Sequence, residues 1–112
     1  SGGTVVPHLV RGVESEVPPA APPLTPAEAD ALRTMLRGVV TSGSGSQLLD
    51  VPGAPVLAKT GTAEFDRDGA RLTHAWMVAA QGDLAVAVYV DVGESGSATA
   101  GPILEAFLRA AA

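Results

Sequence analysis

VLAKTGTAEFDRDGARLTHAWMVAAQGDLAVAVYVDV, residues 56–92, holds three apolar runs separated by two turn signals. The runs at 56–65, 73–80 and 84–92 have the length and the β-branched composition of strands. The Asp-Gly pair at 68–69, between the first two runs, is typical of a tight hairpin. Tight hairpins join antiparallel neighbours. The stretch therefore predicts consecutive strands of an antiparallel sheet.

The third run predicts how the sheet is covered. Along residues 84–92 both alternating sets of side chains are largely apolar. A strand that is apolar on both faces is typical of a sheet buried on both sides. We therefore expect this strand to be central, with helices packed against both faces.

A helix is predicted upstream of the sheet. The stretch TPAE at 25–28 combines a capping threonine, a proline suited to the first helical position and a glutamate that completes a capping box. The Gly/Ser-rich residues 41–46 end this helix. Between them lies an apolar stripe at helical spacing, formed by Leu32, Met35, Leu36, Val39 and Val40.

The two ends of the chain complete the expected fold. Residues 4–13 are predicted to form a short edge strand, and the proline-rich residues 14–24 an extended connector. Residues 102–111 predict a closing helix whose buried side would hold Ile103, Leu104, Phe107 and Leu108. The expected fold class is α+β, an antiparallel sheet packed with helices, in a single small domain.

Composition excludes several classes of function. The formal net charge is −5 and the arginines are scattered, so no basic surface for nucleic acid is expected. The chain has no cysteine, which excludes disulfides, a thiol nucleophile and a thiolate metal site. Two histidines without cysteine give no reason to expect a metal. The sequence begins with SGGT rather than Met, so we expect a fragment or a processed product.

Lys59 is the candidate with the clearest chemistry, since it is the only lysine and follows an apolar strand run. A strand edge can pair with an extended peptide, and Gly61 would let that peptide lie flat. Lys59 would supply a positive charge for a carboxylate, while the hydroxyls of Thr60 and Thr62 could donate to the same anion or pass a proton. The backbone N–H of Thr62 could stabilise an oxyanion. The candidate catalytic residues are therefore Lys59, Thr60 and Thr62, and Gly61 joins them in binding substrate.

Other interpretations of the same residues stay open at this point. GAPVLAKT at 53–60 approaches a phosphate-binding loop, but Ala58 replaces the required glycine and no helix follows. Lys59 could also be an ordinary strand-end lysine. Downstream, we expect Trp76 in the core and His74 as a structural partner, and Glu64 either shapes a cleft or is a rim charge.

The stretch LAKTGTAEF resembles the third conserved motif of penicillin-binding proteins, the serine DD-transpeptidases, in which Lys-Thr-Gly is a signature. The surrounding sequence is similar in order: SGGTVVPHLV, the capped helix, the Gly-Ser loop, VPG and then THAW. The resemblance covers nearly the whole chain. The Ala-Glu pair that follows the motif resembles the sequence at this place in the high-molecular-weight transpeptidases.

The chain departs from that family in two motifs. The nucleophile motif S-x-x-K is absent, because Lys59 is the sole lysine and position 56 is valine. The S-x-N motif is absent because the chain has no asparagine. The resemblance thus implies that residues 1–112 are the C-terminal part of one transpeptidase domain, whose serine lies outside the chain. Alone, the chain would be inactive.

For the complete protein, the resemblance implies that peptidoglycan stem peptides are cross-linked through an acyl-serine, and that β-lactams acylate the same serine. Lys59, Thr60, Gly61 and Thr62 would bind the substrate, without cofactor or metal. The implied partners are stem peptides, β-lactams, and the remainder of the domain or another copy of the chain. The implied location is extracytoplasmic, with a membrane anchor upstream. A DD-carboxypeptidase or β-lactamase, and a β-lactam sensor without turnover, are the alternatives.

Overall fold

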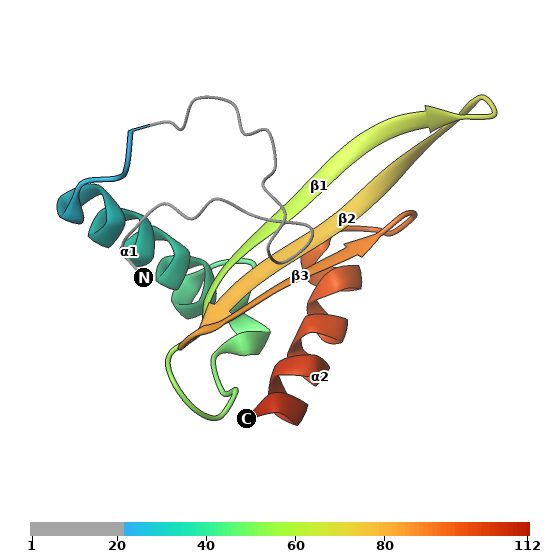
Figure 1. Cartoon of the computed structure of the whole chain (residues 1–112). Helices are drawn as coiled ribbons and strands as arrows, with labels where there is room; N and C mark the ends of the chain where they lie inside the picture. Colours follow the sequence, from blue (N-terminus) through green and yellow to red (C-terminus); the bar gives the residue numbers. More distant parts are fainter. Residues whose placement is uncertain (1–21) are drawn as a thin grey trace, which may run out of the picture. The chain divides into compact units, whose positions relative to one another are not determined.

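The computed structural model describes residues 22–112, and its elements follow one another along the chain as in Figure 1. In order they are α1 (Pro26–Ser42), the 3₁₀ turn η1 (Ser46–Leu48), β1 (Leu57–Arg67), β2 (Ala70–Gln81), β3 (Leu84–Val90), the π-helical turn η2 (Gly96–Ala100) and α2 (Gly101–Ala111). The strand expected at 4–13 lies outside the described residues. The chain divides into two units, Ser1–Leu32 and Arg33–Ala112, and the second contains the whole sheet.

The first unit contains the predicted helix start. The backbone N–H of Thr25 donates to Glu28 Oε2 at 2.8 Å, and the N–H of Glu28 donates back to Thr25 Oγ1 at 3.3 Å. This reciprocal pair is the expected capping box. The hydrogen bond from the Thr25 backbone lowers the pKa of the Glu28 carboxyl, because it favours the ionised form.

The apolar stripe of α1 is buried only toward its C-terminal end. Val40 is fully buried, whereas Leu32 and Met35 are 43% and 63% exposed. Val40, in the last turns of α1, belongs to the core of the second unit.

The three predicted strands form one antiparallel sheet in the order β1-β2-β3. The expected Asp-Gly hairpin joins the first two, with Asp68 and Gly69 both at positive φ, 53° and 77°. Positive φ at both central residues gives the right-handed twist that a tight hairpin requires. Two consecutive hairpins place the middle segment between its neighbours. The expectation that residues 84–92 are central was therefore wrong, since β2 is central and β3 lies at an edge.

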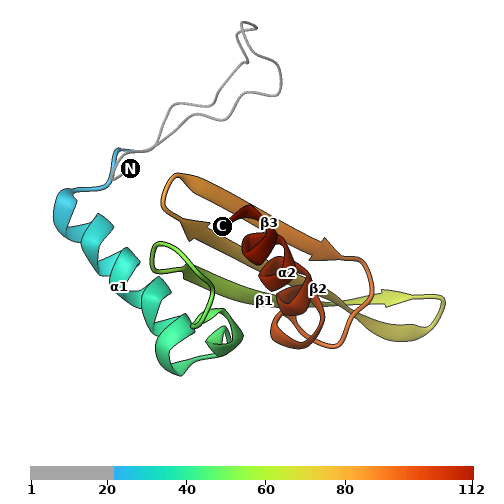
Figure 2. The same ribbon diagram turned by 90° about the horizontal axis from the view of Figure 1, so that it is seen from below.

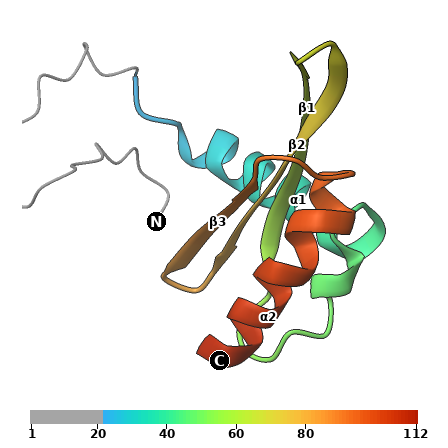
Figure 3. The same cartoon turned by 90° about the vertical axis from the view of Figure 1, so that its right-hand side faces the viewer.

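The core lies on one face of this sheet, which we call the helix face: Ala58, Thr60 and Thr62 of β1, Ala75, Met77 and Ala79 of β2, and Val86 and Val88 of β3. Helix α2 lies along this face (Figures 2 and 3) and contacts both β2 and β3. Ten buried residues form the core between them: Val40, Leu48, Val51, Val56, Ala58, Met77, Ala79, Ala100, Leu104 and Leu108.

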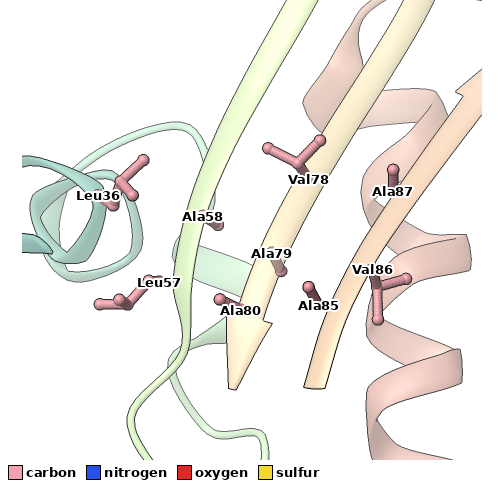
Figure 4. A pocket seen from close by; sticks show the side chains of 9 residues that line it. All are labelled: Leu36, Leu57, Ala58, Val78, Ala79, Ala80, Ala85, Val86 and Ala87. Carbon is pink, nitrogen blue, oxygen red and sulfur yellow. The ribbon is translucent and has the colours of Figure 1, made fainter. Parts of the chain in front are cut away.

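The opposite face, which we call the open face, carries Lys59 and Gly61 of β1, Trp76 and Val78 of β2, and Ala87 and Tyr89 of β3. Trp76, Val78 and Tyr89 are 42%, 43% and 46% exposed. The prediction of a core Trp76 was therefore wrong, and at these residues the described helices do not cover the open face as predicted. One end of this face is hollowed into an apolar cavity of about 340 Å³ (Figure 4). Its lining is Leu36, Leu57, Ala58, Val78, Ala79, Ala80, Ala85, Val86 and Ala87.

Helix α2 also departs from its expected burial. Leu104 and Leu108 are fully buried, while Ile103 and Phe107 are 52% and 50% exposed. A single sheet face covers only a narrow stripe of a helix, so residues beside that stripe stay in contact with solvent. The class of fold, α+β with helices packed on an antiparallel sheet, is confirmed.

Candidate functional site

Lys59 lies on the edge strand β1 and its side chain belongs to the open face. It pairs with Val78 in the register of β1 and β2. The side chain is exposed, and Lys59 Nζ donates to the backbone carbonyl of Thr60 at 2.5 Å. Within residues 22–112 the ammonium forms no ion pair, so its charge is available to an anion from outside.

The hydroxyls of Thr60 and Thr62 lie on the other face of the same strand. Thr60 Oγ1 lies 2.7 Å from the Oγ of Ser44, a residue in the loop that follows α1. Thr62 Oγ1 accepts from the backbone N–H of Gly96 at 3.4 Å, in the turn before α2. Successive side chains of a strand point to opposite faces, so these hydroxyls and Lys59 can reach one ligand only at the free edge of β1.

Gly61 leaves β1 without a side chain between Lys59 and Ala63. It pairs with Trp76, and a Cβ on Gly61 would lie 3.4 Å from the Trp76 Cβ, an ordinary contact distance. The Trp76 ring packs against Tyr89 with ring centroids 4.3 Å apart. On the open face beside Lys59, therefore, no side chain rises from β1 at Gly61, and the aromatic pair Trp76 and Tyr89 borders this position.

A polar and aromatic cluster that the sequence did not predict continues from this pair. His74 stacks on Phe65, with ring centroids 3.9 Å apart, and its Nδ1 lies 2.6 Å from the Asp91 carbonyl oxygen. Tyr89 donates from its hydroxyl to Asp91 Oδ1 at 3.1 Å. Arg67 donates to both carboxylate oxygens of Asp91, at 2.9 and 3.1 Å. His74 is thus a structural partner, as expected.

The charges of this cluster shift its pKa values in consistent directions. The hydrogen bond from Arg67 lowers the pKa of the Asp91 carboxyl, and the same bond raises the pKa of the guanidinium. Burial against its neighbours raises the pKa of the Tyr89 hydroxyl, and its bond to Asp91 adds to this. Asp91 is therefore ionised and paired at neutral pH. Strand alternation could have suggested the cluster, because its members share the open face.

The remaining acidic candidates lie away from Lys59. Glu64 Oε2 lies 3.8 Å from Arg71 Nη1, and each of the two side chains is 70% exposed. A pair so exposed contributes little to stability, so Glu64 is a rim charge. In the part of the chain that the structure describes, no group of His, Cys, Asp and Glu side chains could hold a metal ion.

An edge strand whose ammonium has no ion pair among residues 22–112, flanked by hydroxyls and a glycine, has the chemical groups needed to bind an extended, anionic ligand. The family model of the penicillin binding protein transpeptidase domain matches residues 1–109. The chain belongs to this transpeptidase family. No curated protein and no solved structure matches the chain. Among the described residues no helix is both long and apolar enough to cross a bilayer.

Proposed function

We propose that this chain is the carboxylate-binding part of a peptidoglycan DD-transpeptidase that also binds penicillin. The observation that carries the proposal is the position of Lys59 on an edge strand, with no ion pair among the described residues and followed by a glycine between two threonines. Thr60, Gly61 and Thr62 complete the proposed substrate surface, and Lys59, Thr60 and Thr62 are its proposed catalytic residues.

In this proposal the last residues of a stem peptide pair with the free edge of β1. An edge strand in an antiparallel sheet leaves alternate N–H and C=O groups unpaired, and these can bond an extended backbone. Lys59 reaches the terminal carboxylate from the open face, while Thr60 and Thr62 approach the same edge from the helix face. Gly61 lets the peptide backbone approach closely.

The chemical step needs a serine, which we propose is supplied by polypeptide outside this chain. Its hydroxyl oxygen attacks the carbonyl carbon of the peptide's last amide bond, the C–N bond breaks, and the terminal residue leaves as a free amine that has taken up the hydroxyl proton. The backbone N–H of Thr62 is the proposed donor to the oxyanion that forms. An amine of a second strand then takes the acyl group and releases the serine. A β-lactam carries a carboxylate and a reactive amide and would acylate the serine by the same route.

The open face extends the proposal to partners and location. Trp76, Val78 and Tyr89 leave a largely apolar surface beside Lys59. Cover by the remainder of the same domain, or by another copy of the chain, would remove that surface from water. Family membership supports an extracytoplasmic domain, held at the membrane through an anchor outside this chain, in cell-wall synthesis.

The test is the acylation rate of the complete domain with a fluorescent penicillin. Lys59→Ala removes the charge facing the ligand carboxylate, and loss of a charge-assisted hydrogen bond is worth about 1.5–3 kcal/mol, hence roughly a ten- to hundredfold slower acylation. Lys59→Arg should rescue poorly, because a planar fork does not replace a point charge. The matched control is Arg71→Ala, which removes an exposed cation from the helix face.

Two results would contradict the proposal. One is an unchanged acylation rate in Lys59→Ala with the fold intact. The other is a stable penicillin adduct on the isolated chain, detected by mass spectrometry, since the proposal places the nucleophile elsewhere. Release of the terminal residue without transfer to an added amine would instead identify a hydrolase, and acylation without either reaction a sensor.

A further inference from the structure

We infer that Gln47 and Gly96 are positioning residues, which hold the free edge of β1 at Gly61 and Thr62 from the helix face. The expected effect on acylation rests on the proposed function, but the hold of Gln47 on the strand can be measured separately. The two residues come from turns far apart in the sequence, η1 and η2, and a hydrogen bond joins these turns under the proposed substrate surface.

The first step is that each threonine hydroxyl of β1 is held by a different turn. Thr60 bonds Ser44, in the loop between α1 and η1, at 2.7 Å. Thr62 accepts from the Gly96 N–H, at the start of η2, at 3.4 Å. Both contacts lie on the helix face, so the strand is held from beneath while its free edge and open face stay accessible.

The second step is that the two turns are fastened to each other. Gln47 Nε2 donates to the Ser97 carbonyl oxygen at 3.0 Å, across 50 residues of sequence. The side chain fits closely there, because a Cβ on Gly101 would overlap its amide nitrogen. Gln47 therefore fixes where η2 begins relative to the loop that holds Thr60.

The third step is that η2 touches the backbone of β1 and β2 directly. A Cβ on Gly96 would overlap the Trp76 carbonyl oxygen, and would lie 2.8 and 2.9 Å from the carbonyl oxygen and nitrogen of Gly61. Backbone atoms cannot give way as a flexible side chain can, so any larger residue at this position must displace the strand. η2 is π-helical, a wide turn that is frequent at functional sites.

These contacts predict an effect on rate that exceeds the effect on stability. A displacement of about 1 Å in a positioned group can cost about a hundredfold in rate. The Gln47 side chain donates one hydrogen bond, and the Gln81 side chain donates two, so loss of Gln81 should cost at least as much stability. Gln81 Nε2 donates to the carbonyl oxygens of Pro52 and Ala54, at 2.7 and 2.9 Å, at the end of β2, whereas Gly61 pairs with Trp76 in the middle of that strand.

The experiment compares Gln47→Ala with Gln81→Ala in the complete domain. We expect Gln47→Ala to slow the acylation step at saturating penicillin about tenfold, and Gln81→Ala to leave it unchanged while costing at least as much in urea unfolding. In ¹H–¹⁵N spectra, Gln47→Ala should shift the amides of Gly61 and Thr62 more than Gln81→Ala does. Equal rates and equal shifts in the two variants would overturn the inference.

A conservative variant separates positioning from general loss of structure. In Gln47→Glu the carboxylate faces the Ser97 carbonyl without a donor, and regains one only when protonated. Its acylation rate relative to wild type should therefore rise as the pH falls toward 5. A ratio that is constant with pH would contradict the role of the donated hydrogen bond.

Gly96→Ala tests the direct contact. We expect about a hundredfold slower acylation in the fraction that folds, and wild-type acylation by a folded Gly96→Ala domain would remove Gly96 from the inference. Failure of the proposed function looks different. A wild-type domain that penicillin does not acylate would refute that function, while the amide shifts of Gly61 and Thr62 would still decide whether Gln47 holds the strand.

Discussion

Trp76 and Tyr89 on the open face lead to a prediction about how the isolated chain behaves. They are 42% and 46% exposed, and an aromatic side chain buries about 200 Å², so each leaves roughly 80–90 Å² to be covered. At about 25 cal/mol per Å², covering both rings is worth about 4 kcal/mol. Association of separate molecules costs at least about 4 kcal/mol in lost freedom, so the rings alone give at most weak binding.

The same arithmetic favours cover by the remainder of the domain. When the covering surface belongs to the same polypeptide, most of the association cost is already met by the chain. We therefore expect the isolated chain to associate only weakly, with a dissociation constant in the millimolar range or weaker, and the complete domain to remain monomeric. Sedimentation velocity over that concentration range measures both. Trp76 is the only tryptophan, so its emission reports when the open face is covered.

A pair of variants identifies the surface responsible. Val78→Lys adds a charge at the centre of the open face, beside Lys59, and should abolish association. Ile103→Lys adds the same charge to a somewhat more exposed apolar site on α2, 52% against 43%, and should leave association unchanged. A compact, cooperatively melting monomer at every concentration, with unshifted Trp76 emission on dilution, would refute the reasoning that this face requires a partner.

Two further predictions concern stability. The pKa of Asp91 is lowered in the folded chain by Arg67, so its stabilisation is fully present above the unfolded pKa of about 3.9 and is lost as pH falls through the folded pKa. Urea unfolding of the complete domain at a series of acidic pH values should thus show a shallower loss in Asp91→Asn than in wild type, and equal slopes would contradict this. Leu104→Ala, in the core, should cost about 2–5 kcal/mol in the same assay, whereas Ile103→Ala, at a half-exposed neighbour, should stay within about 1 kcal/mol.

The local elements were predictable because their signals are local. The capping box at Thr25 and Glu28 and the hairpin at Asp68 and Gly69 depend on residues a few positions apart. The position of β3 was not predictable in this way, because apolar residues on both faces indicate burial without saying which strand is central. Exposure on α2 and at Trp76 likewise depends on what covers each face, which periodicity does not contain.

The sequence predicted candidate residues for the site, but not how they are arranged. The sequence singled out Lys59 and the threonines around Gly61, yet it treated their side chains as neighbours on one surface. Strand alternation alone would have separated them. The contacts that hold them, from Ser44 and Gly96, come from turns 16 and 34 residues away in sequence, and no local pattern indicates them.

In the proposed site, the position of the strand accounts for the single lysine. In a central strand, Lys59 and the hydroxyls of Thr60 and Thr62 would serve two separate layers, because neighbours on both sides would lie between them. At the edge, the two faces meet along one line of unpaired backbone, and a ligand lying there can take a charge from one face and hydroxyls from the other. That arrangement requires the edge to stay free of another strand and to stay in place. The open face leaves it accessible, and the turns joined by Gln47 hold it from the other side.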